Sequence, residues 1–316
     1  MALFILFMVV TAVIFEVISL RRVLKNVTCT IATSKKVVDP GEVFEVVTTI
    51  ENNKLLPVTS LRVCENVPEE ITYAEDELEY DIAIKHNKMS NATVAEWKTY
   101  LMPKQKLTKR VPVMIDRRGR YFFSGATVYG GDFLGFSETA EGYYGMNEVV
   151  VLPRKIECSA EIEALGGFLG DVSVRRFIME DPVLTLGYRE YTGNEPMRAI
   201  SWTQSARMGN LMVKNYDHTL EMVVTVILNV EQPEDEPDNE LIEKSFSLAR
   251  EVCEYLEEKG IRYQFITNAS AAGAVGLWSS IDDGLGANHL MTILEGLGRA
   301  TYTKTDSFAG MMEKVI

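Results

Sequence analysis

The residues best suited to chemistry gather in one segment, GYREYTGNEPMRAISWTQSARMGNLMVKNYD, which covers positions 187–217. Its cations are Arg189, Arg198, Arg207 and Lys214, in a chain that is otherwise acidic. Guanidinium groups donate several N–H groups in a planar fork, and arginine is enriched at interaction hot spots. The segment is therefore a candidate surface for an acidic partner.

The same segment contains the signals of a short helix. Asn194, Glu195 and Pro196 are typical of a helix start, and Gly209 is typical of a stop, so we expect a helix over about 196–208. The residues that follow the helix, LMVKNYD, are expected to form a strand. Arg198 precedes Trp202 by one turn and is placed to stack on its ring.

Two roles are open for this helix. In the first, Tyr191, Ile200 and Trp202 pack it onto a sheet, and replacing Trp202 by alanine costs about 3–5 kcal/mol of stability. In the second, the basic side chains bind a partner and the segment contributes little to the core. The packing role is the one that the spacing favours.

Other residue types give weaker signals. The four cysteines are far apart and form no C-x-x-C pair, and Cys253 falls on a predicted buried stripe, which indicates reduced and unreactive thiols. The histidines, His86, His218 and His289, lack the spacing of metal ligands. Gly130, Gly131 and Gly135 are not followed by Lys-Ser or Lys-Thr, so they predict tight turns and no phosphate cradle.

Charge and length exclude some classes of function. The 316 residues suggest about two domains. The 32 basic and 45 acidic residues give a net charge of −13, which argues against binding nucleic acid through its phosphates. No cofactor is expected from any motif.

The first twenty residues, MALFILFMVVTAVIFEVISL, are almost entirely apolar and are followed by Arg21, Arg22 and Lys25. At about 1.5 Å per residue they nearly cross a hydrocarbon core of about 30 Å, so we expect one transmembrane helix. A cleavable signal peptide is the alternative, but it would carry its basic residues before the apolar run. The positive-inside rule then predicts a single-pass protein of the cell membrane with its bulk in the cytoplasm.

Between about Cys29 and Leu152 the sequence alternates with a period of two. Phe44, Val46, Thr48 and Ile50 fall on one face of a predicted strand, and turn residues 39–41 precede it. Similar runs recur at short intervals, which predicts a β-sandwich of the immunoglobulin-like kind.

After Pro153 the pattern becomes mixed. The apolar run EMVVTVILNV predicts a strand covered on both faces. A long helix follows, capped by Asp238 and ended by Gly260, and RYQFITNA is the next strand. Its buried stripe is predicted to comprise Ile242, Phe246, Ala249, Cys253 and Leu256. A strand, a helix and a strand form a right-handed crossover with parallel strands, so this half is expected to be α/β.

The basic segment also resembles a known family. It is similar to the signature of the domain of unknown function 58 family, about G-x-R-x-Y-x-x-G-D-x-x-R-x-I-x-W-x-x-x-A-R-x-x-x-L-x-V-K. The matching residues are Gly187, Arg189, Glu190, Tyr191, Gly193, Pro196, Arg198, Ile200, Trp202, Ala206, Arg207, Leu211, Val213 and Lys214. Asn194-Glu195 replace the family's aspartate after Gly193. Upstream, Asp132, Phe133, Gly135 and Phe136 match a second family segment with altered spacing.

The resemblance implies a membrane-anchored protein with a von Willebrand factor A-like domain, which works with a MoxR-type AAA+ ATPase. Such domains often hold Mg²⁺ in an Asp-x-Ser-x-Ser motif after their first strand, because this ion prefers carboxylate and hydroxyl oxygens. Here Asn229, Glu231 and Pro233 stand at these positions, so we expect no metal there. Asp235, Glu236 and Asp238 are then a solvated acidic loop.

The expected fold class is α+β overall: a transmembrane anchor with its basic flank (1–27), an immunoglobulin-like β-sandwich (28–153) and an α/β von Willebrand factor A-like domain (154–316). The last domain ends on a helix where a further strand is expected, which indicates a shortened C-terminus. The expected function is a membrane-tethered interaction or scaffold module for assembly or maturation of other proteins, with a cytosolic AAA+ ATPase and other membrane proteins as partners. The alternative is a hydrolase or metal-dependent enzyme, although no catalytic motif supports it.

Overall fold

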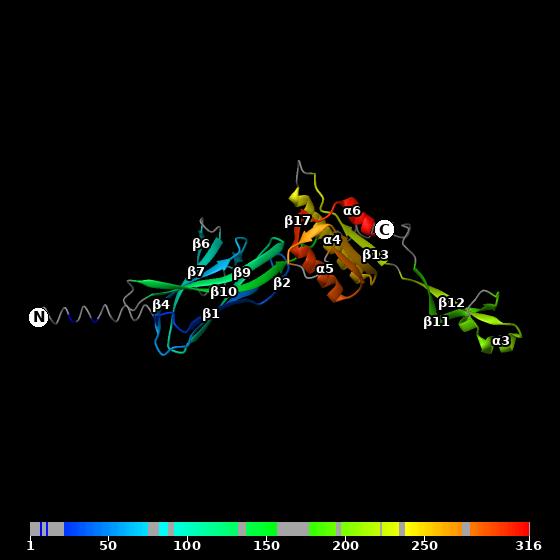
Figure 1. Ribbon diagram of the computed structural model, residues 1–316, viewed down its shortest axis with the longest axis horizontal. Helices are drawn as coiled ribbons and strands as arrows, with labels where there is room; N and C mark the ends of the chain where they lie inside the picture. The colour runs from blue at the N-terminus through cyan, green and yellow to red at the C-terminus, as the bar shows by residue number, and fades with distance from the viewer. Residues whose placement is uncertain are drawn as a thin grey trace.

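The structure is a computed structural model that describes residues 7, 11, 22–74, 82–87, 92–131, 137–156, 177–193, 197–221, 223–233, 238–273 and 279–315. Figure 1 shows three parts in a row. We call them the sandwich (residues 22–156), the C-terminal unit (223–315) and the arm (177–221). The C-terminal unit lies between the other two, and the arm extends away from it.

The sandwich consists of two β-sheets. One has the order β1-β3-β8-β5 and the other β2-β10-β9-β4-β7-β6. All neighbouring strands pair antiparallel except β2 and β10. The strands are β1 (Val27–Thr33), β2 (Val37–Val38), β3 (Phe44–Asn52), β4 (Val58–Val67), β5 (Thr72–Tyr73), β6 (Ala83–Asn87), β7 (Ala92–Leu101), β8 (Lys106–Met114), β9 (Gly119–Gly131) and β10 (Glu138–Val151). The prediction of a β-sandwich is confirmed.

The alternation of β3 shows why these residues form a sheet face. Phe44, Val46, Thr48 and Ile50 are all buried, and the residues between them are half-buried, as the period of two predicts. Two apolar clusters between the sheets contain the apolar residues of this face: Ile50 lies in one with Trp97, and Phe44 and Val46 lie in the other with Phe123.

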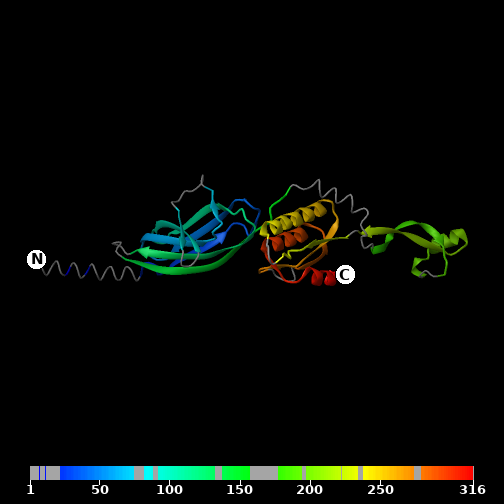
Figure 2. The same cartoon turned by 90° about the horizontal axis from the view of Figure 1, so that it is seen from above.

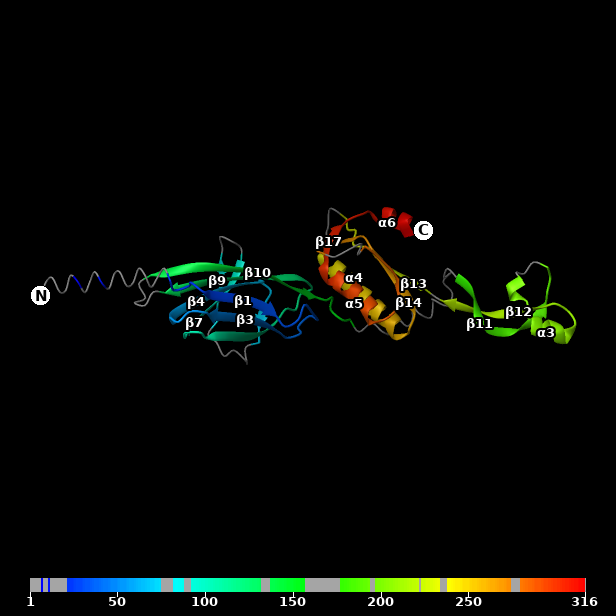
Figure 3. The same cartoon turned by 60° about the horizontal axis from the view of Figure 1, so that its bottom comes forward.

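The C-terminal unit contains short strands and three helices. Its elements are β13 (Val223–Leu228), α4 (Asn239–Glu258), β14 (Arg262–Thr267), β15 (Ala269–Ala271), β16 (Ser280–Gly284), α5 (Ala287–Arg299), β17 (Ala300–Lys304) and α6 (Phe308–Val315). Strands β13 and β14 pair parallel, β16 joins β14 antiparallel, and β15 pairs with β17 in a separate ribbon. Helices α4 and α5 lie side by side against the sheet (Figures 2 and 3).

The long helix forms as its sequence predicts. The Asp238 carboxylate accepts the backbone N–H groups of Glu240 and Leu241, and Gly260 has a positive φ of 66° just past the end. The predicted stripe is buried and packs against the sheet and α5. The crossover from β13 through α4 to the parallel strand β14 is therefore confirmed as a local unit.

The expected fold class as a whole is wrong. Strands make up 50% of the structure and helices 23%, so the protein is mostly β. Within the described part of the C-terminal unit only β13 and β14 run parallel, which is not the sheet of a von Willebrand factor A-like domain. Strand β13 was also expected to be covered on both faces. Val224 and Val226 do pack toward α4, but Ile227 on the other face is 37% exposed.

The expected membrane anchor is corrected too. In the described part of the chain, no helix has the length and apolar character needed to cross a bilayer. The segment 1–20 that carried this prediction lies outside the described residues, apart from Phe7 and Thr11. The expectation of a single-pass membrane location falls with that finding.

Candidate functional site

The basic segment forms the end of the arm, which is a β-hairpin of β11 (Phe177–Glu190) and β12 (Met212–Glu221). Between the strands lie a 3-10 turn η2 (Met197–Ala199) and the helix α3 (Trp202–Met208). The helix ends at Gly209, which has a φ of 78° as the stop signal predicts. It begins six residues later than expected, and the 3-10 turn takes the place of its first turn.

A few hydrogen bonds join the helix to the hairpin. The Ser205 hydroxyl donates to Ser201 O and accepts the N–H of Met212, both at 2.8 Å. Ser201 N–H donates to Met212 O at 2.9 Å, and Ile200 forms an isolated bridge with Val213. Ile200, Met212 and Val213 are buried, at 5%, 8% and 2% exposure. Residues 188–214, which we call the arm tip, thus have a very small core of their own.

Large apolar side chains cover the outside of the arm tip. Trp202 is 61% exposed, and helix α3 has no buried residue. Four other large apolar side chains of the arm tip are also exposed: Tyr188 at 44%, Met197 at 69%, Met208 at 68% and Leu211 at 45%. The prediction that Trp202 packs into a core is therefore wrong. Helical spacing placed Trp202 on a face with small residues, but α3 packs on its own hairpin, where Ser205 makes the contact with Met212 and Trp202 stays exposed.

The charged residues of the motif belong to the same arm tip. Arg189 and Arg207 are exposed, Tyr191 and Lys214 are half-buried, and Glu190 accepts a hydrogen bond from Asn210 Nδ2 at 3.3 Å. Arg198 lies in η2, but its side chain is outside the described part, so its stacking on Trp202 stays a prediction. The structure thus brings the predicted residues onto one arm. The motif did not single out the exposed methionines Met197 and Met208, which lie within the same segment.

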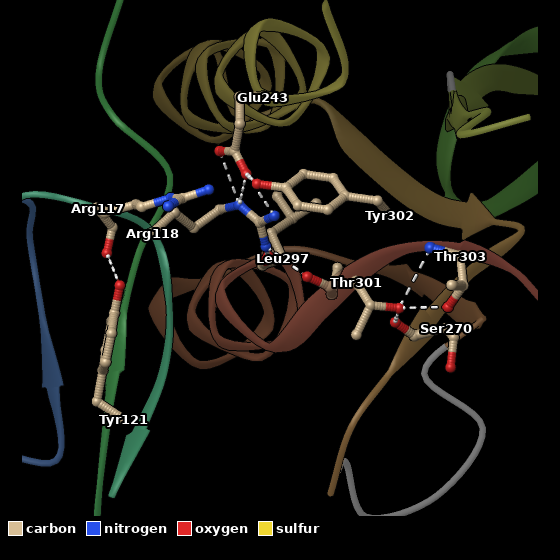
Figure 4. A network of polar contacts seen from close by, with 10 residues as sticks. Arg117, Arg118, Tyr121, Glu243, Ser270, Leu297, Thr301, Tyr302 and Thr303 are labelled. Atoms are coloured by element: carbon tan, nitrogen blue, oxygen red, sulfur yellow. Dashed lines mark hydrogen bonds and ion pairs between the residues drawn. The ribbon is translucent and has the colours of Figure 1, made fainter. Parts of the chain in front are cut away.

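A separate network of polar contacts joins the sandwich to the C-terminal unit (Figure 4). Arg118 precedes β9, and its side chain is only 4% exposed. It donates to the Glu243 carboxylate at 2.7 to 3.1 Å and to the carbonyls of Leu297 and Ala300 at 2.7 and 2.6 Å. Its guanidinium lies 4.0 Å from the Phe246 ring centre. A cation thus caps the C-terminal end of α5, where the helix dipole is negative.

Two further arginines cross the same junction in the opposite direction. Arg250 of α4 donates to Asp39 Oδ1 at 2.5 Å and to the Pro153 carbonyl at 2.6 Å. Arg299 of α5 contacts Glu148 of β10, which also pairs with Arg120. We call these contacts, with that of Arg118, the arginine junction. No sequence motif predicted it, and the only signal was the run Arg117-Arg118-Gly119-Arg120 at the start of β9.

The junction shifts the titration of its acids. Burial by itself raises the pKa of Glu243, but hydrogen bonds from Arg118 and Tyr302 outweigh it and lower the pKa below its ordinary 4.5. Burial by itself also raises the pKa of Glu148, but hydrogen bonds from Arg299 and Arg120 outweigh it, so this pKa is lowered as well. Both carboxylates are thus held in their charged form by the arginines that they bind.

Two hollows of about 640 and 510 Å³ flank the junction, and both border Arg117, Arg118 and Tyr302. The larger also borders Arg154, which pairs with Asp116 at 2.6 Å. Most of the charged groups in these walls are engaged in ion pairs across or beside the junction. We therefore assign the hollows to the connection between the two parts.

The loop matched to a metal site follows β13. Asn229 Oδ1 accepts from Glu231 N–H at 3.0 Å and from Asn268 Nδ2 at 2.8 Å. The Glu231 carboxylate accepts from Lys304 Nζ at 2.6 Å and from Phe308 N–H at 2.9 Å. Protein donors thus occupy these oxygens. Within the described ranges no three His, Cys, Asp or Glu residues are placed to hold a metal, and Asp235 and Glu236 lie outside them.

The remaining candidates have ordinary surroundings. Cys253 is fully buried, as predicted, and burial raises the pKa of its thiol to about 12. His289 lies with Nε2 3.0 Å from the Tyr263 carbonyl, and His86 lies 3.4 Å from the Thr93 hydroxyl. The His218 side chain and residues 132–136 of the upstream family segment are outside the described part.

Comparisons with known proteins add little to this geometry. No family model matches the chain, and no curated protein matches it. Among solved structures, a cohesin module from a Clostridium perfringens family 33 glycoside hydrolase is similar at 14% identity and a TM-score of 0.27, over 40% of this chain and 95% of that one. A type II cohesin module from an Acetivibrio cellulolyticus scaffoldin is similar at 10% identity and a TM-score of 0.28, over 40% of this chain and 97% of that one. A CARDB domain from Pyrococcus furiosus is similar at 16% identity and a TM-score of 0.26, over 40% of this chain and 90% of that one. TM-scores this low carry no argument about function.

Proposed function

We propose that the protein is a protein-interaction module whose arm tip binds an acidic partner, and that the partner is a MoxR-type AAA+ ATPase. The observation that carries the proposal is the 61% exposure of Trp202 on a helix without any buried residue. Tryptophan, methionine and arginine are enriched at interfaces, and exposed apolar groups that gather at one place mark binding sites.

Charge supports an acidic partner. The segment 187–217 has four arginines and lysines against three glutamates and aspartates, whereas the whole chain has a net charge of −13. An acidic surface with an apolar centre would complement Trp202 and the exposed Arg189 and Arg207. The ATPase is named because the segment resembles the signature of the domain of unknown function 58 family. The alternative of a hydrolase gains no specific observation from the described residues.

The test is binding of the full chain to the purified MoxR-type ATPase of the same organism, measured by biolayer interferometry. Trp202→Ala is expected to weaken binding at least about 30-fold, because truncating a hot-spot tryptophan costs about 2 kcal/mol or more. Arg207→Ala is expected to weaken it several-fold, and the effect should shrink at high salt.

The matched control is Tyr144→Ala, which removes a 92% exposed aromatic ring from β10 of the sandwich. It should leave binding unchanged. Equal binding by wild type and Trp202→Ala would refute the arm tip as the site. If light scattering instead shows wild-type dimers that Trp202→Ala dissociates, the partner is a second copy and the ATPase assignment is wrong.

A further inference from the structure

The interior of the sandwich contains a lysine with an unusual environment. Lys109 of β8 is 1% exposed, and its Nζ is the one buried side-chain N or O atom of the described part that has no hydrogen-bond partner. It lies 3.5 Å from Glu65 Oε1 and 4.2 Å from the Trp97 ring centre. A buried ammonium is costly unless it is well paired and hydrogen-bonded.

Glu65 reaches the same place from the other sheet. It belongs to β4, its side chain is 4% exposed, and its Oε1 accepts the Trp97 Nε1–H at 2.6 Å. The two charged groups thus face each other across the core, out of water. Groups that are held next to each other in a fixed geometry gain a large effective concentration.

We propose that Lys109 and Glu65 form an intramolecular amide bond that links the two sheets of the sandwich. The Lys109 ammonium gives a proton to the Glu65 carboxylate, and the freed Nζ lone pair forms a bond to Glu65 Cδ. One carboxyl oxygen then leaves with two protons as water, so the N–C bond replaces a C–O bond. No oxidant, reductant or further reactant is needed.

The surroundings favour each part of this reaction. Burial lowers the pKa of Lys109 to about 8, so the neutral and nucleophilic amine is accessible near neutral pH. The Trp97 N–H donates to the oxygen that gains negative charge when Nζ attacks. The product replaces two buried charges by one neutral amide, which removes their desolvation cost.

The experiment is the intact mass of the folded full-length protein, measured under denaturing conditions after incubation at pH 8. We expect a mass below that of the sequence by one water molecule. Trypsin should no longer cleave after Lys109, and a branched peptide should join it to the peptide that contains Glu65. Lys109→Arg should restore the full mass, whereas Lys106→Arg on the same strand should keep the deficit.

Glu65→Gln gives a second readout, because the same attack on an amide releases ammonia in place of water. A wild-type mass equal to that of the sequence, with normal cleavage after Lys109, would overturn the proposal and leave a buried ion pair. A deficit that peptide mapping places at other residues would overturn it equally. All these masses are read on denatured chains, so a folding defect in one variant does not affect the wild-type result.

Discussion

The arginine junction and the arm tip use the same residue type in opposite ways. At the junction, the Arg118 and Arg250 side chains are 4% and 3% exposed and bind carboxylates and carbonyls of the neighbouring part. At the tip, Arg189 and Arg207 are exposed beside an exposed tryptophan. Burial thus decides whether an arginine holds the fold together or is presented to a partner. The following variants test this contrast, beginning with the largest expected effect on stability.

Arg118→Ala is expected to lower the free energy of unfolding by about 3–5 kcal/mol, because it leaves the Glu243 carboxylate half-buried without its cation. It also removes the donors to Leu297 O and Ala300 O. Urea denaturation measures the effect. Arg207→Ala is the matched control and should change stability by less than about 0.5 kcal/mol. Equal effects of the two variants would remove the contrast.

Gly298→Ala tests how closely the two parts pack. A Cβ at Gly298 of α5 would lie 2.5 Å from Val150 Cγ1 and 3.0 Å from Val151 O of β10. The two parts would have to separate, at a cost of about 1–3 kcal/mol. Gly187→Ala in the arm is the control, because no atom beyond its own residue and its two chain neighbours lies within 4 Å of the added Cβ. Thermal melting that ranks the variants in the reverse order would contradict the close packing.

Acid should open the junction. The folded pKa values of Glu243 and Glu148 lie below the ordinary 4.5, so the folded state binds fewer protons than the unfolded state. The stability that these two ionised carboxylates give the folded state is fully present above about pH 4.5, and it is lost as the pH falls through their lowered folded-state pKa values. After division by the intrinsic exchange rate at each pH, hydrogen exchange should show lower protection of the amides of α4 and α5 at pH 3 than at pH 5. In the variant Glu243→Gln this pH dependence should become smaller, and an unchanged dependence would exclude Glu243 as its source.

Trp202→Ala should have the smallest effect on stability, within about 0.5 kcal/mol, because the ring is mostly exposed. The sequence alone had suggested about 3–5 kcal/mol for a core ring. Urea denaturation of the same preparation used for binding measures it. A loss of several kcal/mol would show that the ring is buried in solution.

The sequence by itself determined the local elements. The period of two in Phe44–Ile50 gave β3 its buried face, and the helical stripe from Ile242 to Leu256 gave α4 its own, because a side chain's direction along a strand or helix follows from backbone geometry. Asp238 and Gly260 set the ends of α4 through local hydrogen bonding and a positive φ. The basic residues of the arm were likewise visible as a cluster in the chain.

Only the tertiary structure decided what covers each face. Arg118 and Glu243 are 125 residues apart, and Lys109 and Glu65 meet only because two sheets stack, so no local pattern encodes either contact. Trp202 shows the same limit, since helical spacing gives it a face but not the neighbour that would bury it. The helix packs on its own hairpin, far from the core that its composition suggested, and this leaves the tryptophan exposed.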